Sequence, residues 1–470
     1  MALSIARKIA YDVLLRVEAE GAYASDVLHI RLGAQIKPAD AALATEITMG
    51  VLRSRRFLDS LLDPLLKKPV AQLDLPVAIA LRMGLYQLRY LQRVPPSAAV
   101  NESVNLVKMA RKASAAPLVN AVLRRAAALP AKNTVLYGAG AAKAPAKMRG
   151  IANNSPADQL GILHSHPTWM VERWLARFGE ERTIGLLEAN NRSPRLTLAL
   201  HDENPRDEII DSLRKSGLQV ESGQLLKSAI AVSAGSPART TAFQSGAISI
   251  QDEASQVIPL LLDVNAGDSV LDVCAAPGGK TATLVRAAGQ QGIVVAADLH
   301  AHRLGAMRSQ FQRLKIGNLN FVKLNATREL PFRAAFQRIL VDAPCSGTGT
   351  LSRHPEIRWR LRPEQLAEFH RLQVDILINA IAMLAPQGRL VYSTCSVEPE
   401  ENEDVVGEAL QKSAPLQLRQ VTSDSAAVSL KDHLIPGVDA RELFDAEAQF
   451  RTVPGERATD GFFAAILERP

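Results

Sequence analysis

The sequence has few cysteines and few aromatic residues, and it lacks any long uninterrupted apolar segment. Three cysteines in 470 residues, far apart and without a C-x-x-C pair, argue against a disulfide framework or a zinc site. No apolar run reaches the roughly 18 residues that a membrane-spanning helix needs. The N-terminal segment MALSIARKIAYDVLLRVEAEG interleaves charged and apolar residues, so it predicts a helix and not a signal peptide. We therefore expect a cytoplasmic protein with free thiols, no membrane association and no metal.

The chain is too long for a single hydrophobic core. At roughly 150 residues per domain, its length suggests about three domains. Its composition, 47% hydrophobic and 22% charged, is ordinary for a globular protein. The formal net charge of +7 is compatible with a polyanionic partner but does not identify one.

Helical periodicity marks the N-terminal region. Apolar residues recur four apart at Ile5, Ile9, Val13 and Val17, and strand-like alternation is scarce up to about residue 129. We predict an all-α domain of about six or seven helices over residues 1–130. Its basic residues fit a solvated helical surface and an RNA-binding face about equally well. They are Arg53, Arg55, Arg56, Lys108, Arg111, Lys112, Arg124 and Arg125.

The rest of the chain predicts a linker followed by two α/β regions. Residues 131–162, rich in Ala, Gly, Pro and Lys, are typical of a linker. Residues 163–235 combine helical and strand-like segments and predict a small α/β subdomain. Over residues 236–470 short apolar strands alternate with helices, which predicts a parallel sheet covered on both faces. The main strands are expected at 269–273, 292–298, 318–324, 336–344 and 388–394.

All three cysteines follow predicted strands of this sheet. Cys274 follows SVLDV, Cys345 lies in RILVDAPCSG and Cys395 follows LVYST. Ligands of parallel sheets bind beyond the carboxyl ends of the strands. A free cysteine is also a common small buried filler, and for any single one of the three we favour that interpretation. Three cysteines at one predicted edge shift the balance toward function.

A glycine turn and an acid suggest a cofactor that contains adenosine. In DVCAAPGGKTATL, the glycines let the backbone approach a ligand, and the following helix offers N-terminal N–H groups. The turn matches neither G-x-x-x-x-G-K-[ST] nor G-x-G-x-x-G, which disfavours a standard phosphate cradle. Asp298 ends the next strand, where a carboxylate can accept ribose hydroxyls or cap the following helix.

Six motifs together resemble a known family. They are QDEASQ, DVCAAPGGKT, VDAPCSGTG, RHPEIRW, YSTCSVEPEEN and DGFF. They are similar to the motifs of S-adenosylmethionine-dependent RNA 5-methylcytosine methyltransferases, specifically of the bacterial small-subunit ribosomal RNA methyltransferase B (Sun) type. Residues 4–129 resemble the antitermination factor NusB, and only the linker falls outside the resemblance. It implies a multidomain fold, with an all-α NusB-like RNA-binding domain before an α/β, Rossmann-like class I methyltransferase domain.

The resemblance implies roles for the residues at the strand ends. Cys395 would add to C6 of cytosine as a thiolate, because C5 alone is too weak a nucleophile. Cys345 would remove the C5 proton and release the product, and Asp342 would recognise the base and stabilise the adduct. Lys280 would face the active site. S-adenosyl-L-methionine would contact Cys274, Ala275, Ala276, Pro277, Gly278, Gly279, Lys280, Asp298, Asn325 and Asp342.

The implied substrate is 16S ribosomal RNA, either naked or in an early assembly intermediate. The target base would have to be unstacked or flipped to expose C6. Two further functions remain open at this stage: a transfer RNA cytosine-C5 methyltransferase, and a non-catalytic RNA-binding or ribosome-assembly factor.

Some positions depart from the family pattern or need their own interpretation. Asn325 stands where an aspartate is common near the adenine, and Ala199 and His201 replace an arginine and an asparagine in the small subdomain, which we expect to bind RNA. The acids after Cys395 are expected to begin a helix, where carboxylates complement the N-terminal dipole. They are Glu398, Glu400 and Glu401.

Overall fold

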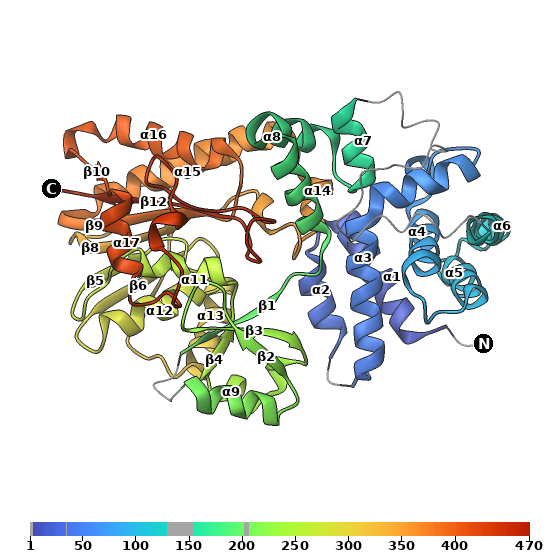
Figure 1. The fold of residues 1–470 in the computed structure, drawn as a ribbon, viewed down its shortest axis with the longest axis horizontal. Helices are drawn as coiled ribbons and strands as arrows, with labels where there is room; N and C mark the ends of the chain where they lie inside the picture. The colour runs from blue at the N-terminus through green and yellow to red at the C-terminus, as the bar shows by residue number, and fades with distance from the viewer. Residues whose placement is uncertain (1–2, 34, 129–154, 202–205) are drawn as a thin grey trace. The chain divides into compact units, whose positions relative to one another are not determined.

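The computed structural model describes residues 3–33, 35–128, 155–201 and 206–470. The chain divides into two compact units, of which unit 1 contains residues 1–193 and 351–361, and unit 2 contains the rest (Figure 1). The four domains predicted from the sequence are a finer division and stay a prediction. Most of the expected linker lies outside the described residues. Within the described ranges, no helix has the length and apolar character to span a membrane.

Unit 1 is built from helices, and those of residues 5–127 confirm the predicted all-α region, whereas a helix over residues 156–163 stands where the end of the linker was expected. In α1 the buried stripe is Ala6, Ala10, Val13 and Val17, whereas Ile5 is 47% exposed. The reason is that residues four apart drift around a helix of 3.6 residues per turn. The α-helices are α1 (Ile5–Glu20), α2 (Ala24–Arg31), α3 (Pro38–Leu62), α4 (Leu75–Tyr90), α5 (Pro96–Met109), α6 (Ala116–Ala127), α7 (Pro156–Leu163), α8 (Thr168–Asn191) and α14 (Ile357–Arg360). The 3-10 turns η1 (Asp63–Leu65), η2 (Val70–Gln72) and η3 (Ala113–Ala115) connect them.

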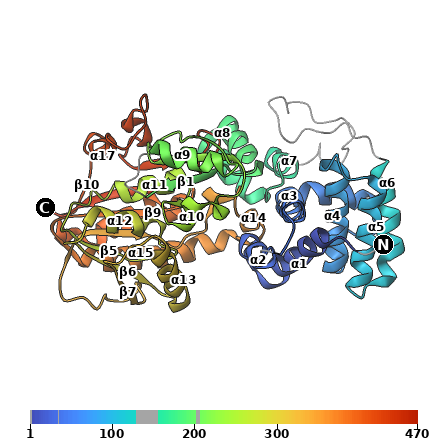
Figure 2. The same ribbon diagram turned by 90° about the horizontal axis from the view of Figure 1, so that it is seen from below.

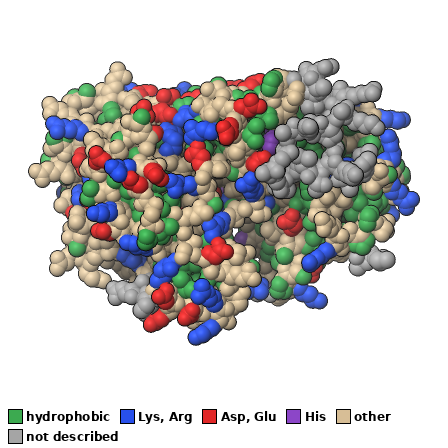
Figure 3. Space-filling view, viewed as in Figure 1, with side chains coloured by type: hydrophobic (Ala, Val, Ile, Leu, Met, Phe, Trp, Pro, Cys, Tyr) green, Lys and Arg blue, Asp and Glu red, His purple; other side chains and the backbone are tan. Residues whose placement is uncertain are grey.

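Of the eight basic residues singled out from the sequence, some are held in contacts within unit 1, including Lys112 through its ion pair with Asp74 at 2.6 Å, and others are exposed. Arg53 is buried, Arg55 pairs with Glu18 at 3.1 Å, and Arg56 forms an ion pair with Asp158. These arginines hold unit 1 together and are not part of an open basic face. The exposed members lie on or beside α5 and α6, and they are Lys108, Arg111, Arg124 and Arg125. Across the view of Figure 3, Lys and Arg side chains are dispersed among Asp and Glu side chains.

The RHPEIRW motif belongs to unit 1 although unit 2 flanks it on both sides in the sequence. Arg358 of α14 is fully buried and donates to Asn190 O at 3.0 Å and to Asn191 Oδ1 at 2.8 Å. The indole of Trp359 donates to Leu52 O at 2.8 Å. The motif is therefore an anchor of the chain within the helical unit.

Unit 2 contains a small antiparallel sheet in the order β2 (Gln219–Ser222), β3 (Ala229–Ala234), β1 (Leu196–Leu200), β4 (Ile248–Ile250). Its helices are α9 (Arg206–Lys215) and α10 (Thr241–Gln244). The β2–β3 loop is held by the buried carboxylate of Glu253, which accepts from the N–H groups of residues 224–226 at 2.6–2.9 Å. Glu253 of the QDEASQ motif thus joins the small sheet to the rest of unit 2.

The large sheet of unit 2 is mixed, because strands that the sequence did not predict pair antiparallel with the parallel sheet that it did predict. Its core is parallel, in the order β9 (Leu384–Thr394), β8 (Phe336–Asp342), β5 (Ser269–Asp272), β6 (Ile293–Asp298), β7 (Asn320–Lys323). These strands confirm the five predicted ones. The strand β12 (Phe462–Glu468) pairs antiparallel with β9, and β10 (Arg419–Gln420) and β11 (Phe450–Thr452) pair with β12.

Helices cover both faces of this sheet, as Figures 1 and 2 show. Alternate strand residues point to opposite faces, so Val270 and Val391 pack with α11 (Glu253–Leu260), α12 (Gly279–Ala288), α13 (Ala301–Arg313) and α17 (Ser423–Leu430). Their neighbours Leu271 and Tyr392 pack with α15 (Pro363–Ala382) and α16 (Glu403–Lys412). Two apolar layers therefore support the strand ends.

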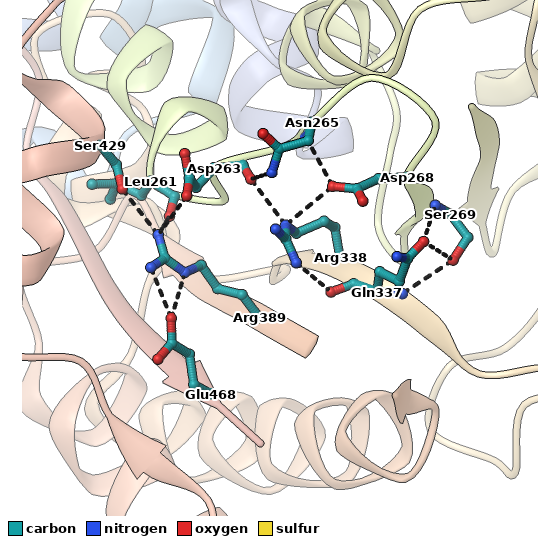
Figure 4. Close-up of polar contacts among 10 residues, drawn as sticks. All are labelled: Leu261, Asp263, Asn265, Asp268, Ser269, Gln337, Arg338, Arg389, Ser429 and Glu468. Atoms are coloured by element: carbon teal, nitrogen blue, oxygen red, sulfur yellow. Dashed lines mark hydrogen bonds and ion pairs between the residues drawn. The ribbon is translucent and has the colours of Figure 1, made fainter. Parts of the chain in front are cut away.

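Polar contacts tie together the amino ends of the parallel strands (Figure 4). Arg389 of β9 forms an ion pair with Glu468, its cross-strand neighbour on β12, at 2.7 Å. Arg338 of β8 donates to Asp263 O at 2.9 Å and pairs with Asp268 at 3.3 Å. This end of the sheet is closed by structural contacts, and the chemistry-bearing side chains lie at the other end.

Candidate active site

The strand order reverses between β5 and β8, and side chains from both strands meet there. The chain runs from β5 outward to β7, and then returns to β8 on the other side of β5. Lys280 is the second residue of α12, after β5, and its Nζ lies 2.7 Å from Asp342 Oδ2 at the end of β8. Ser393 on β9 donates to Asp342 Oδ1 at 2.9 Å. Such a reversal point is where doubly wound sheets bind ligands.

The structure brings Cys345 and Cys395 together beyond the ends of β8 and β9. Their sulfur atoms lie 3.3 Å apart, although 50 residues separate them in the chain. Both side chains are partly accessible, and neither is in a disulfide. The Cys395 backbone carbonyl accepts from Gly349 N at 2.9 Å, in the turn η5 (Thr348–Thr350) that follows Cys345. The two cysteine loops therefore pack directly on each other.

The two sulfurs have different surroundings. The hydrogen bond with Cys395 raises the pKa of the Cys345 thiol, and burial raises it further. Cys345 is therefore a neutral thiol near pH 7. The third cysteine, Cys274, lies just after β5, where burial and the carboxylate of Asp272 raise its pKa. Cys274 is consequently not a thiolate, in keeping with a role for its backbone rather than its sulfur.

The turn from Cys274 to Gly279 forms a close-packed cradle before α12. Gly278 has φ of +102°, and a Cβ there would lie within 3.0 Å of the side chains of Met307 and Phe311. Asp272, at the end of β5, is buried and accepts from Thr281 Oγ1 at 2.6 Å with Oδ2. Its other oxygen, Oδ1, is buried without a hydrogen-bond partner among the described residues. Burial raises the pKa of this carboxyl to about 7.

Asp298 ends β6 beside this cradle, as predicted. Its oxygens accept from Ala276 N at 3.3 Å and from His300 N at 2.9 Å, and Arg303 Nη1 lies 3.3 Å from Oδ2. His300 is the N-cap residue of α13. Asp298, two residues earlier, therefore stabilises the start of this helix by accepting the hydrogen bond from the His300 N–H. The arginine partner was not foreseen from the sequence.

Asn325 follows β7 and is exposed. Its Oδ1 accepts from the N–H of Thr327 at 3.1 Å and from the Thr327 hydroxyl at 2.8 Å, which is an Asx-turn. Asn325 thus has a local structural role, and its amide NH₂ is the part suited to a ligand.

The departures at Ala199 and His201 lie on or just after β1 of the small sheet. Ala199 is buried, and His201 Nε2 lies 2.6 Å from Ser249 Oγ. Burial, with smaller contributions from Arg286 and Arg313, lowers the pKa of His201 to about 3. His201 is therefore a neutral residue packed within unit 2.

The acids after Cys395 do not begin the helix, which corrects the expectation from the sequence. They lie at the turn η6 (Pro399–Glu401), and α16 begins after Asn402. Glu398 and Glu401 are buried, because the turn directs them inward, where backbone and hydroxyl donors surround Glu401.

Sequence reasoning also missed other neighbours of the site. Phe462, of the DGFF motif, has its ring centroid 5.1 Å from Lys280 Nζ, and Ser393 holds Asp342. The serines that follow both cysteines contact Glu401. The repeated Cys-Ser dipeptide, at 345–346 and 395–396, was the available signal.

Comparison with known proteins shows which family the chain is similar to. The family model "16S rRNA methyltransferase RsmB/F" matches residues 259–468, the NusB family model matches 4–128, and a ferredoxin-like domain of RsmF/B-like methyltransferases matches 166–239. The chain is 30% identical to the probable ribosomal RNA small subunit methyltransferase B of Bacillus subtilis, over 98% of each chain. The chain belongs to the ribosomal RNA small subunit methyltransferase B family.

Other relatives agree with this family membership. The Vibrio cholerae ribosomal RNA small subunit methyltransferase B is 32% identical over 93% of this chain and 91% of its own. The crystal structure of PH0851 has the same fold, with a TM-score of 0.79 at 22% identity, over 100% of this chain and 99% of that one. The protein is thus an RNA methyltransferase with a NusB-like helical domain and a Rossmann-like catalytic domain, as the resemblance implied.

Proposed function

We propose that this protein methylates C5 of a cytosine in 16S ribosomal RNA, through a covalent bond between Cys395 Sγ and C6 of the base. The observation that carries the proposal is the pair of sulfur atoms 3.3 Å apart, beside the Asp342 carboxylate at the carboxyl ends of β8 and β9. One attacking sulfur suffices to form an adduct. A second sulfur within contact distance suits a reaction in which the same adduct must later lose a proton and break down.

Cys395 carries out the first step in this proposal. Its thiolate adds to C6, and the electron pair of the C5–C6 double bond makes C5 nucleophilic toward a methyl group. Asp342, held by Lys280 and Ser393, faces the polar edge of the base and stabilises the adduct through a hydrogen bond. These contacts fix the carboxylate before the base arrives, so little reorganisation is needed.

Cys345 carries out the last step. It takes the proton from C5 as a thiolate; the electron pair of that C–H bond restores the double bond and expels the Cys395 thiolate. In the free enzyme, the hydrogen bond with Cys395 is the first cause that raises the Cys345 pKa. Once Cys395 is a thioether, it has no S–H to donate and its sulfur is only a weak acceptor, so this hydrogen bond is weakened. The thiolate form of Cys345, which removes the proton, is thereby favoured after the adduct has formed.

The residues before α12 fit S-adenosyl-L-methionine, which supplies the methyl group when bound. The N-terminal N–H groups of α12 suit its carboxylate, and the partnerless buried oxygen of Asp272 suits its ammonium group. The backbone from Cys274 through Ala275, Ala276 and Pro277 to Gly279 lines this cradle, and Asp298 and Asn325 would take its nucleoside end. The pKa of Asp272 would fall beside a cation.

The substrate assignment draws on the names of the relatives and on charge. The matching family model is described as a 16S rRNA methyltransferase, and the exposed basic residues of α5 and α6 offer contacts to phosphates. We assign RNA binding to this helical unit and to the small sheet. Transfer RNA is the alternative substrate that the test below distinguishes.

The test combines labelled S-adenosyl-L-methionine with unmodified 16S ribosomal RNA, and with transfer RNA in parallel. Label at cytosine C5 of the ribosomal RNA is expected for the wild type and none for Cys395→Ala. Cys345→Ala should accumulate a protein–RNA adduct, seen as a shifted band on a denaturing gel, because product release is blocked. The matched control Cys345→Ala/Cys395→Ala should give no such band. Full activity in Cys395→Ala, or label confined to transfer RNA, contradicts the proposal.

A further inference from the structure

Two parallel Cys-Ser dipeptides form the core of the site. Each cysteine is followed by a serine, Ser346 and Ser396, and both serines are buried. Their hydroxyl oxygens lie 3.3 Å apart, the same separation as the two sulfur atoms. The two loops therefore run side by side, and the cysteines are partly accessible whereas the serines that follow them are buried.

One carboxylate holds both dipeptides from the buried side. Glu401 is 0% exposed, and its Oε1 accepts from Ser346 N at 2.7 Å, while Oε2 accepts from the Ser346 hydroxyl and from the Ser396 hydroxyl at 2.5 Å. Gln373 of α15 donates to Oε1 at 3.1 Å. A buried carboxylate is costly unless its oxygens are hydrogen-bonded, and here both oxygens have two donors. Burial nonetheless raises the pKa of Glu401.

Further contacts fix Glu401 itself. The Tyr392 hydroxyl donates to Glu401 O at 2.6 Å. Asn402 accepts from Thr394 Oγ1 at 2.5 Å and donates to Ser396 O at 3.0 Å, which closes the turn after Cys395. Gln373 also donates to Pro344 O at 2.9 Å, directly before Cys345. Glu401 is therefore a rigid centre to which both loops are bound, and not a mobile surface acid.

The geometry points to Glu401 as a positioning residue that sets the separation of the two reactive sulfurs. This inference deepens the proposed function and rests on it for its catalytic meaning. Glu401 bonds to the residue after each cysteine, so its loss lets the two loops move independently. A displacement of about 1 Å between reacting groups can cost about 10²-fold in rate. Among the residues that the structure describes, Glu401 has no hydrogen bond to the Cys274–Gly279 turn, so cofactor affinity should be spared.

The test compares Glu401→Ala and Glu401→Gln with the wild type. Glu401→Gln keeps the shape and one acceptor oxygen, and the serine hydroxyls can turn to accept from its NH₂, so it should retain more activity than Glu401→Ala. We expect kcat for methylation to fall about 100-fold in Glu401→Ala and about 10-fold in Glu401→Gln, with KM for S-adenosyl-L-methionine within about twofold. Glu368→Gln, at an exposed position of α15, is the matched control with wild-type kcat.

A second readout does not need methyl transfer. Diamide takes two electrons and two protons from the thiols of Cys345 and Cys395 to give a disulfide and a hydrazine, and the rate reports how often the sulfurs are in contact. We expect this rate to fall about 10-fold in Glu401→Ala while the melting temperature of Glu401→Gln stays close to that of Glu368→Gln. Slower cross-linking in an enzyme that does not methylate cytosine would overturn the proposed function but keep the positioning role. Wild-type kcat and cross-linking in both variants would overturn the positioning role.

A purely structural role would give a third pattern. In that case kcat would fall only in proportion to the folded fraction, and both Glu401 variants would cross-link at the wild-type rate per folded molecule. This outcome would also overturn the inference. Circular dichroism at the assay temperature supplies the folded fraction for this comparison.

Discussion

The sulfur atoms of Cys345 and Cys395 lie 3.3 Å apart, just beyond the carboxyl ends of the adjacent strands β8 and β9. The pairing of two loops distant in sequence, and not the sequence around either cysteine, creates this contact. This contact predicts how the two thiols react with an oxidant, and other contacts of unit 2 predict how stability responds to mutation and to pH.

The thiol pair should be open to reversible oxidation. We expect diamide to join Cys345 and Cys395 in preference to any pair that includes Cys274, because only the first two sulfurs are recorded in contact among the described residues. Peptide mass spectrometry identifies the linkage, and dithiothreitol should restore methyl transfer. Predominant linkage through Cys274 would show that the sulfur contact does not persist in solution.

Position 349 should not tolerate a side chain, because Gly349 packs directly against the backbone of Gly461. A Cβ on Gly349 would lie 2.2 Å from Gly461 O, so Gly349→Ala is expected to destabilise the protein by about 1–3 kcal/mol. Gly407, within α16, has nothing within 4 Å of its Cβ position, so Gly407→Ala should stabilise the protein by up to about 1 kcal/mol. Urea unfolding measures both, and equal effects of the same sign would contradict the packing at Gly349.

Asp272 should make stability fall as the pH rises. Burial raises its pKa to about 7 from the ordinary value of 3.8, so between about pH 4 and 7 the folded state binds the proton that the unfolded state has lost. The free energy of unfolding therefore decreases across this window, by on the order of 1–4 kcal/mol, and levels off above it. Asp272→Asn keeps an acceptor for Thr281 and lacks this dependence. The free energy of unfolding of Asp272→Asn, measured in urea, should exceed that of the wild type by an amount that grows from pH 4 to 7. A difference that does not change with pH would contradict the raised pKa of Asp272.

His201 should have the opposite dependence. Its pKa is lowered to about 3 from 6.5. Between about pH 6.5 and 3 the unfolded state therefore binds a proton at His201 that the folded state does not bind. Stability contributed by neutral His201 is therefore present above pH 6.5 and is lost as the pH falls toward 3, by about 1 kcal/mol at pH 5.5. His201→Gln can still contact Ser249 and should lose less stability between pH 7.5 and 5.5. Parallel curves for the two proteins would argue against burial of His201.

Much of the fold was predictable because secondary structure follows local patterns. The five parallel strands and the helices of residues 5–127 were recognised from apolar periodicity over short windows. The strand β12 was missed, although its run FFAAILE is apolar, because its antiparallel place beside β9 depends on the chain returning from the far side of the sheet. The strand β4 was likewise assigned to the catalytic region and not to the small sheet.

The candidate site was predictable where motif and strand end coincide. Cys345, Cys395, Asp342 and Lys280 were chosen from short motifs, and the structure brings each cysteine to its partner and Lys280 to Asp342. The structural role of Glu401 could not be predicted from the sequence. A carboxylate in a cluster of acids is expected at the surface, and burial is compatible with folding here because four donors hydrogen-bond to its oxygens.

Covalent spacing after an apolar strand sets where a side chain emerges, so the residue types at the strand ends could be predicted from short motifs. Which of these side chains meet depends on how the strands and helices pack in the folded chain. Glu401 reaches Ser346 from 55 residues away and Gln373 from 28, and RHPEIRW packs into the helical unit. Such contacts arise when strands pair and helices pack, and the free energy of burying each polar group depends on partners that no local pattern specifies.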